Sequence, residues 1–272
     1  MISALLVLGC VDRAFAQTSF TKESFTATDG TALPYRKASI PGIGDKASLI
    51  IYLHGGSSKG DDNETQLQEP GINYITEWLT QNNRKAIMVV PQCAKDKSWI
   101  GDMLVTVKAM LQTFVDRGVA DNVYIFGGSM GGTGTWNMLS LYPNFFAAAM
   151  PVAGSPSGLN AENVAQTPLF TVMGTADRLM KIPTVESFLA DMDTYNAEYR
   201  FETEEGWSHE DTCKKSYTKE RLNWVFSHKR NTESSVNGIS TNDIMSTTWF
   251  NLDGKRLNGE PQQKGTKIAI GI

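Results

Sequence analysis

The chain has 272 residues, of which 41% are hydrophobic, 10% aromatic and 20% charged, and its formal net charge is -4. This length suits one large α/β domain or two small ones, and the apolar fraction is sufficient for a packed core. The mildly acidic balance argues against nucleic acids and anionic membranes as partners, because neither would be attracted to it. The sequence contains no run of about 18 apolar residues, so no membrane span is predicted.

The N-terminus, residues 1–16, predicts a secretory signal peptide that is cleaved before Gln17. The apolar run from Ile2 to Cys10 is too short for a membrane span, and Ala14-Phe15-Ala16 matches a small-x-small cleavage site. A lipoprotein signal with the lipid on Cys10 and a buried N-terminal helix are the alternatives. The expected location is therefore secreted or periplasmic, with lipid anchoring through Cys10 as the variant.

Residues 17–230 alternate between apolar runs and helical patterns. An opening hairpin is expected over residues 24–40, and continuous apolar runs predict further strands. These strands are 47–53, 86–90, 122–126, 147–152, 169–173 and 199–203. Helices are expected over 102–117, 130–141, 185–195 and 214–228. Strands that alternate with helices predict an α/β fold with a doubly wound, mostly parallel sheet and helices on both faces.

After residue 230 the composition changes. Residues 231–246 are rich in Ser, Thr and Asn and predict a linker. Residues 247–272 hold short apolar pairs between glycine turns, which predicts a short β-rich tail that is too small for a core of its own.

The strongest chemical signal is Gly127-Gly128-Ser129-Met130-Gly131, which directly follows a predicted strand and precedes a predicted helix. This context is typical of a nucleophile elbow, in which a sharp turn exposes the serine and leaves no room for side chains two residues before or after it. A glycine-rich phosphate loop is the other interpretation. Neither the P-loop lysine nor the dinucleotide-binding spacing is present, which favours a nucleophile at Ser129.

Two backbone N–H groups are predicted to stabilise the oxyanion. One belongs to Met130, directly after the serine, and the other to the loop Leu53-His54-Gly55-Gly56 that follows an earlier strand. Gly56 is the first choice for the second donor, and Ser57 is the close rival. His54 itself is interpreted as structural.

The general base and the acid must follow the serine in the chain, because this fold uses the order serine, acid, histidine. His209 lies in a loop after a strand and is the predicted base, whereas His228 at the end of the last helix suits a surface role. Asp177 follows the strand at 169–173 and is the predicted acid, with Glu186 and Asp191 as more distant rivals.

Further residues are expected near the same sheet edge. Trp99 and Trp207 are predicted to stack on the substrate, whereas Trp136 is assigned to the core. A disulfide between Cys93 and Cys213 is predicted for an oxidising compartment, with two unpaired thiols as the alternative. No metal site is predicted, because the cysteine spacing does not suit one and the chain has only three histidines.

These motifs carry a resemblance over residues 24–230. The chain resembles the predicted peptidase or esterase group of α/β hydrolases, close to secreted feruloyl and acetylxylan esterases and polyhydroxybutyrate depolymerases. The matching segments are Leu53-His54-Gly55-Gly56, Gly60-Asp61-Asp62-Asn63, Pro91-Gln92-Cys93, Val123 to Gly132, and Gly174 to Asp177. The resemblance implies the α/β-hydrolase fold with a triad of Ser129, Asp177 and His209.

The tail carries a separate resemblance. Phe250-Asn251-Leu252-Asp253-Gly254, followed by Pro261 and Gly265, resembles the C-terminal tails of secreted Bacteroidetes proteins. This implies a sorting or accessory tail.

The expected activity is that of a secreted serine carboxylesterase acting through an acyl-enzyme, with acetyl or feruloyl esters of plant polysaccharide as first choice. No cofactor is required. A lipase or polyester depolymerase, a serine peptidase, an acyltransferase and a non-catalytic binding protein are the alternatives. The expected partner is a small-molecule or polysaccharide ester, and the sequence assigns no oligomeric state.

Overall fold

A computed structural model of the chain describes residues 18–230, 247–250, 256–257 and 268–271. The predicted signal peptide and linker lie outside these residues. Contacts divide the chain into two units, residues 1–230 and 231–272. No helix in the described part is long and apolar enough to cross a membrane.

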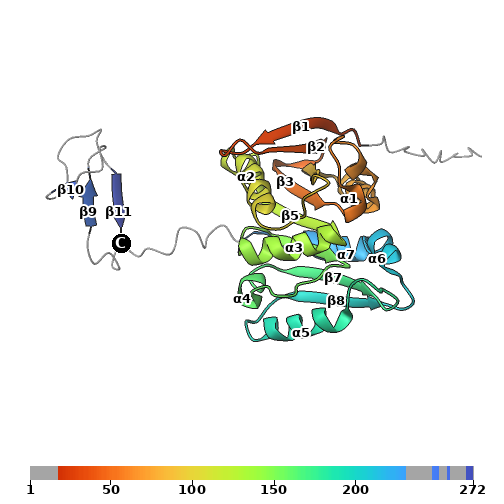
Figure 1. Cartoon of the computed structure of the whole chain (residues 1–272). Helices are drawn as coiled ribbons and strands as arrows, with labels where there is room; N and C mark the ends of the chain where they lie inside the picture. Colours follow the sequence, from red (N-terminus) through yellow and green to blue (C-terminus); the bar gives the residue numbers. More distant parts are fainter. Residues whose placement is uncertain (1–17, 231–246, 251–255, 258–267, 272) are drawn as a thin grey trace, which may run out of the picture. The chain divides into compact units, whose positions relative to one another are not determined.

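Within residues 18–230, eight strands form one sheet in the order β1-β2-β4-β3-β5-β6-β7-β8 (Figure 1). The strands are β1 (Thr21–Thr26), β2 (Ala32–Ile40), β3 (Ile43–Leu53), β4 (Arg84–Pro91), β5 (Ala120–Gly128), β6 (Ala148–Val152), β7 (Leu169–Gly174) and β8 (Tyr199–Glu204). β1 and β2 pair antiparallel, β2 also runs antiparallel to β4, and each later pairing is parallel. The predicted opening hairpin and mostly parallel sheet are confirmed.

Residues 18–230 also contain seven α-helices and two short 3-10 helices, which lie between the strands or, for α6 and α7, after β8. The α-helices are α1 (Pro70–Gln81), α2 (Asp102–Asp116), α3 (Met130–Leu141), α4 (Ala161–Val164), α5 (Ile182–Asp193), α6 (His209–Lys215) and α7 (Lys219–Ser227). The 3-10 helices are η1 (Gly56–Ser58) and η2 (Thr65–Gln68). Figure 1 shows them distributed along the sheet from β1 at one side to β8 at the other.

The sheet is buried on both faces. Alternate residues of β3 point to opposite sides, so that Leu49, Ile51 and Leu53 enter a cluster with α2, α3 and α5. Ile50 and Tyr52 enter a second cluster with α1 and α7. Full burial of one such side chain stabilises the fold by about 1.5–3 kcal/mol. Burial on both faces explains why the strands are continuous apolar runs in the sequence.

Three helical regions differ from the expectation, one of which is the short helix α4, which was not predicted. The predicted helix at 214–228 is two helices, because the Thr218 hydroxyl accepts a hydrogen bond from the Arg221 N–H and starts α7 anew. α1 was not predicted, although Ile72, Ile75 and Leu79 have helical spacing and are buried.

The second unit is described by itself. β9 (Thr247–Phe250) pairs antiparallel with β10 (Arg256–Leu257) and with β11 (Ile268–Gly271), which gives a sheet of order β10-β9-β11.

Candidate active site

Ser129 occupies a strained turn between β5 and α3. Its φ is 58° and its ψ is -117°, a conformation that non-glycine residues rarely adopt. The Ser129 N–H donates to the carbonyl of Val152 at 3.0 Å, which ties the turn to the end of the neighbouring strand β6. Strain of this kind persists only where the surrounding structure enforces it, and it is concentrated at functional sites.

Gly127 and Gly131 have no room for a side chain. A Cβ at Gly131 would lie 1.8 Å from the carbonyl oxygen of Leu53, and a Cβ at Gly127 would lie 2.4 Å from that of Gly131. These are the positions two residues after and two before the serine. The steric reason for the Gly-x-Ser-x-Gly pattern is therefore visible in the backbone.

His209 and Asp177 complete a hydrogen-bonded chain with Ser129. His209 Nε2 lies 2.7 Å from Ser129 Oγ, and His209 Nδ1 lies 2.7 Å from Asp177 Oδ2. An ionised carboxylate can only accept, so Nδ1 carries the proton and Nε2 is free to accept from the serine hydroxyl. The structure thus brings together the three residues that the sequence proposed as nucleophile, base and acid.

Local structure fixes both partners of Ser129. Asp177 lies in the turn after β7, where its Oδ1 accepts from the N–H groups of Leu179 at 2.8 Å and Met180 at 3.0 Å. His209 is the first residue of α6, whose start is held by a capping box between Ser208 and Asp211. The Asp177 side chain is fully buried and that of His209 is 18% exposed, which leaves the imidazole reachable from the solvent side.

The predicted oxyanion donors lie at two helix starts. Met130 is the first residue of α3, and Gly56 is the first residue of η1. N–H groups in the first turn of a helix have no acceptor within that helix, so both are available to a ligand. Gly56, Ser57 and Ser129 line one hollow of about 590 Å³. Met130 and Gly56 remain the predicted donors, with Ser57 still the rival of Gly56.

Glu69 was missed by the sequence reasoning. It lies directly before α1, lines the same hollow as Ser129, and accepts hydrogen bonds from the loop that holds Gly56. Nothing in the sequence distinguishes this carboxylate from the others, because its importance depends on the packing of α1 beside the end of β3.

Sequence comparison finds a partial relative among curated proteins. No family model matches the chain. The bifunctional acetylxylan esterase/xylanase XynS20E of Neocallimastix patriciarum is 27% identical over 160 residues, which span 54% of this chain and 22% of that protein. The chain thus spans about a fifth of the length of this curated relative.

Solved structures give the fold. A thermostable esterase superposes with a TM-score of 0.71 at 24% identity, over 78% of this chain and 63% of the other. The esterase Pf2001 of Pyrococcus furiosus superposes with a TM-score of 0.62 at 15% identity, over 79% and 94%. This similarity agrees with the observed strand order and with the strand-turn-helix arrangement at Ser129. The chain has the α/β-hydrolase fold.

The α/β-hydrolase fold accounts for the order of the three residues. Ser129 follows β5, Asp177 follows β7 and His209 follows β8, so all three lie at the carboxyl edge of the parallel strands. Ligands of open α/β sheets bind at this edge, because loops and helix N-termini gather there.

The other two histidines have structural positions. His54 is buried, its Nδ1 lies 2.7 Å from the Gly55 carbonyl oxygen, and its Nε2 accepts from the Cys93 N–H at 2.9 Å. Burial lowers the pKa of His54 to about 4, so the ring is neutral at pH 7. His228 ends α7 and contacts Glu198 at 2.9 Å, away from Ser129. The position of His54 agrees with its predicted structural role, whereas the His228 side chain is only 14% exposed and packs against Trp224 instead of lying on the surface.

The two tryptophans that were predicted to stack on the substrate have different surroundings. Trp99 is fully buried, and its indole N–H donates to the His54 carbonyl at 2.9 Å, so its prediction as a substrate platform is wrong. Trp207 is partly buried beneath the cations of Lys215 and Arg221, and it does not line the hollow beside Ser129. Trp136 is buried in the core as expected.

The predicted disulfide is also wrong. Cys93 and Cys213 are both free thiols. Cys93 belongs to the core cluster on the α2 and α3 face of the sheet, whereas Cys213 packs against the cluster on the α1 and α7 face. Burial raises the pKa of Cys93 to about 11 and that of Cys213 to about 12, with the Glu69 and Asp177 charges adding to the latter. Nearness to one sheet edge does not place two thiols on one face.

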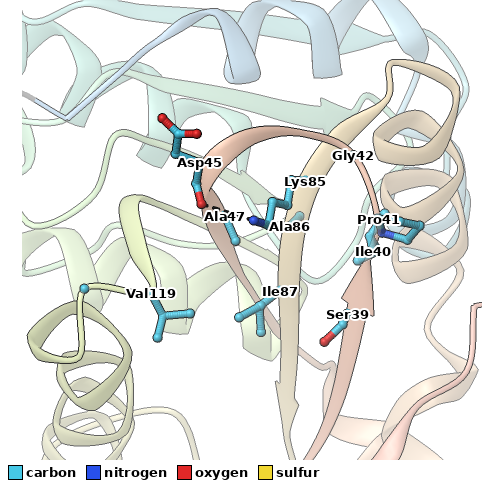
Figure 2. A pocket seen from close by; sticks show the side chains of 11 residues that line it. Ser39, Ile40, Pro41, Gly42, Asp45, Ala47, Lys85, Ala86, Ile87 and Val119 are labelled. Atoms are coloured by element: carbon cyan, nitrogen blue, oxygen red, sulfur yellow. Dashed lines mark hydrogen bonds between the residues drawn. The ribbon is translucent and has the colours of Figure 1, made fainter.

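A second hollow lies at the opposite, amino edge of the sheet. It has a volume of about 580 Å³ and is lined by the end of β2, the start of β4 and the segment around Val119 (Figure 2). Its one lysine, Lys85, donates to the carbonyl oxygens of Gly44 and Asp45. No predicted site residue lies there.

Proposed function

We propose that this chain is a serine carboxylesterase that hydrolyses carboxylic esters through an acyl-enzyme. The observation that carries the proposal is the hydrogen-bonded chain from Ser129 Oγ through the His209 ring to the buried Asp177 carboxylate. In this geometry the base contacts the nucleophile and is itself held by a third group, which is the arrangement that activates a serine hydroxyl.

The reaction follows from these contacts. His209 Nε2 takes the hydroxyl proton as Ser129 Oγ attacks the ester carbonyl, and the N–H groups of Met130 and Gly56 stabilise the negative charge that develops on the carbonyl oxygen. His209 then gives the proton to the departing alcohol, which leaves the acyl group on the serine. Water then attacks the acyl carbon while His209 takes its proton, and His209 returns that proton to Ser129 Oγ as the bond to the acyl carbon breaks, which releases the acid and the free serine.

The proposed substrates are acetyl or feruloyl esters on plant polysaccharide. The 27% identity to a bifunctional acetylxylan esterase/xylanase supports this choice. Ser129 lies in an open hollow of about 590 Å³, which leaves room for a bulky group beside the scissile ester. Export directed by residues 1–16 belongs to the same proposal, because a polysaccharide is met outside the cell.

Hydrolysis of a substrate panel tests the proposal. The panel contains p-nitrophenyl acetate to decanoate, methyl ferulate, acetylated xylan and a peptide amide, each incubated with the purified chain and with Ser129→Ala. We expect turnover of short or aryl esters that is lost in the variant, and the best ester identifies the substrate class. Turnover of the peptide amide alone would contradict the esterase assignment, and no turnover of any substrate would contradict the catalytic function.

A further inference from the structure

Glu69 places a carboxylate against the loop that follows β3. The residue is only 9% exposed, yet it lines the hollow that contains Ser129. Its Oε1 accepts two hydrogen bonds at 2.8 Å, one from the Gly55 N–H and one from the Ser58 hydroxyl. A buried carboxylate is retained in a fold only where polar groups satisfy it, and here both groups come from one short loop.

The two contacts hold both ends of η1. Gly55 is the residue before this 3-10 helix and Ser58 is its last residue, and the Ser58 N–H returns to the Gly55 carbonyl at 3.2 Å. Gly56 and Ser57 lie between the two anchors. Their N–H groups have no acceptor in the first turn, and both residues line the hollow beside Ser129. Glu69 thus anchors both ends of the segment that carries these N–H groups.

The fold fixes Glu69 in turn. It precedes Pro70, the first residue of α1, and proline restricts the residue before it to extended backbone, as observed at φ -66° and ψ 119°. α1 packs through Ile72 and Ile75 into the core cluster beneath the sheet. The carboxylate also lies at the N-terminal end of α1, where the helix dipole favours negative charge. Glu69 thus links the position of a packed helix to the segment Gly55–Ser58.

We propose that Glu69 is the positioning residue of the oxyanion loop. It acts through Gly55 and Ser58 and does not contact the ester itself. The proposal rests on the esterase function above, and it predicts an effect on the transition state rather than on substrate binding. Removal of an oxyanion donor lowers kcat by about 10²–10³, so loss of the acceptor that aims one donor is expected to lower kcat by about tenfold to a hundredfold.

The test compares variants on p-nitrophenyl acetate. We expect Glu69→Ala to lower kcat by about tenfold to a hundredfold with KM within about twofold, because only the transition state carries the oxyanion. Glu69→Gln keeps an oxygen acceptor and should restore kcat to within about threefold of the wild type. Ser58→Ala removes one of two anchors and should lower kcat by about threefold to tenfold. Glu64→Ala, an exposed carboxylate paired with Lys22, is the matched control and should leave both constants unchanged.

The outcomes separate the two proposals. An active wild type with an unchanged kcat in Glu69→Ala would overturn the positioning role alone. Equal losses in Glu69→Ala and Glu69→Gln, or a change confined to KM, would overturn it as well. If Glu69→Ala does not fold, Ser58→Ala decides, and an unchanged kcat there contradicts the proposal. A wild type that turns over no ester would instead overturn the esterase function, and the positioning role with it.

Discussion

The two edges of the sheet carry hollows of nearly equal size and different chemistry. The carboxyl-edge hollow has a volume of about 590 Å³ and the amino-edge hollow about 580 Å³. The first contains a serine in a strained turn that is hydrogen-bonded to a histidine, whereas the lysine of the second donates to backbone carbonyls. Volume alone therefore does not mark the site. The parallel strands place their C-terminal turns and the starts of α3, α6 and η1 at one edge, and the reactive groups follow from that.

The largest expected difference in kcat between variants at the two edges comes from Asp177, the proposed catalytic acid. Asp177→Asn should lower kcat for p-nitrophenyl acetate by about 10⁴, because a neutral amide does not stabilise the imidazolium and its NH2 group favours the wrong tautomer of His209. Asp45→Asn at the amino-edge hollow is the matched control and should keep the wild-type kcat. Similar losses in both variants would mean that Asp177 has no special role.

Glycine substitutions sharpen the comparison, because each edge has a glycine without space for a Cβ. A Cβ at Gly131 would lie 1.8 Å from the backbone oxygen of Leu53, and a Cβ at Gly42 would lie 2.1 Å from the backbone nitrogen of Lys85. We expect either Gly→Ala change to lower the free energy of unfolding by about 3 kcal/mol, measured by urea denaturation.

Activity should distinguish these two glycine variants. Folded Gly42→Ala should retain the wild-type kcat, whereas folded Gly131→Ala should lose most of it, because the turn at Ser129 must move. Equal kcat values in the two folded variants would show that the backbone around Ser129 does not control the reaction.

A pH dependence of stability is expected from His54. Burial lowers its pKa from 6.5 to about 4, so the unfolded chain binds a proton more readily than the folded chain. The contribution of neutral His54 to the free energy of unfolding is fully present above about pH 6.5. This contribution falls by at most about 3 kcal/mol as the pH falls toward 4. In His54→Gln the free energy of unfolding, measured by urea denaturation, should depend less on pH over this range. An unchanged slope would contradict this assignment.

Sequence and structure agree best where a local pattern has one steric solution. Gly-x-Ser-x-Gly after a strand leaves little freedom, and the chain order of the fold then selects Asp177 and His209. Trp99 and the two cysteines were misjudged because closeness to a sheet edge in the sequence does not say which face a side chain enters. Trp99 points into the core and donates to the His54 carbonyl, and the thiols lie with opposite core clusters. Glu69 could not be found, since its contacts join segments that are 11 and 14 residues apart only after α1 has packed.

Covalent labelling tests the central claim most directly, because it asks which atom is the nucleophile. The purified chain is incubated with a fluorophosphonate probe, and the modified peptide is identified by mass spectrometry. We expect one probe on each chain, attached to Ser129, no labelling of Ser39 in the amino-edge hollow, and no labelling of Ser129→Ala. An unlabelled wild type, or a probe on another residue that persists in Ser129→Ala, would contradict the account.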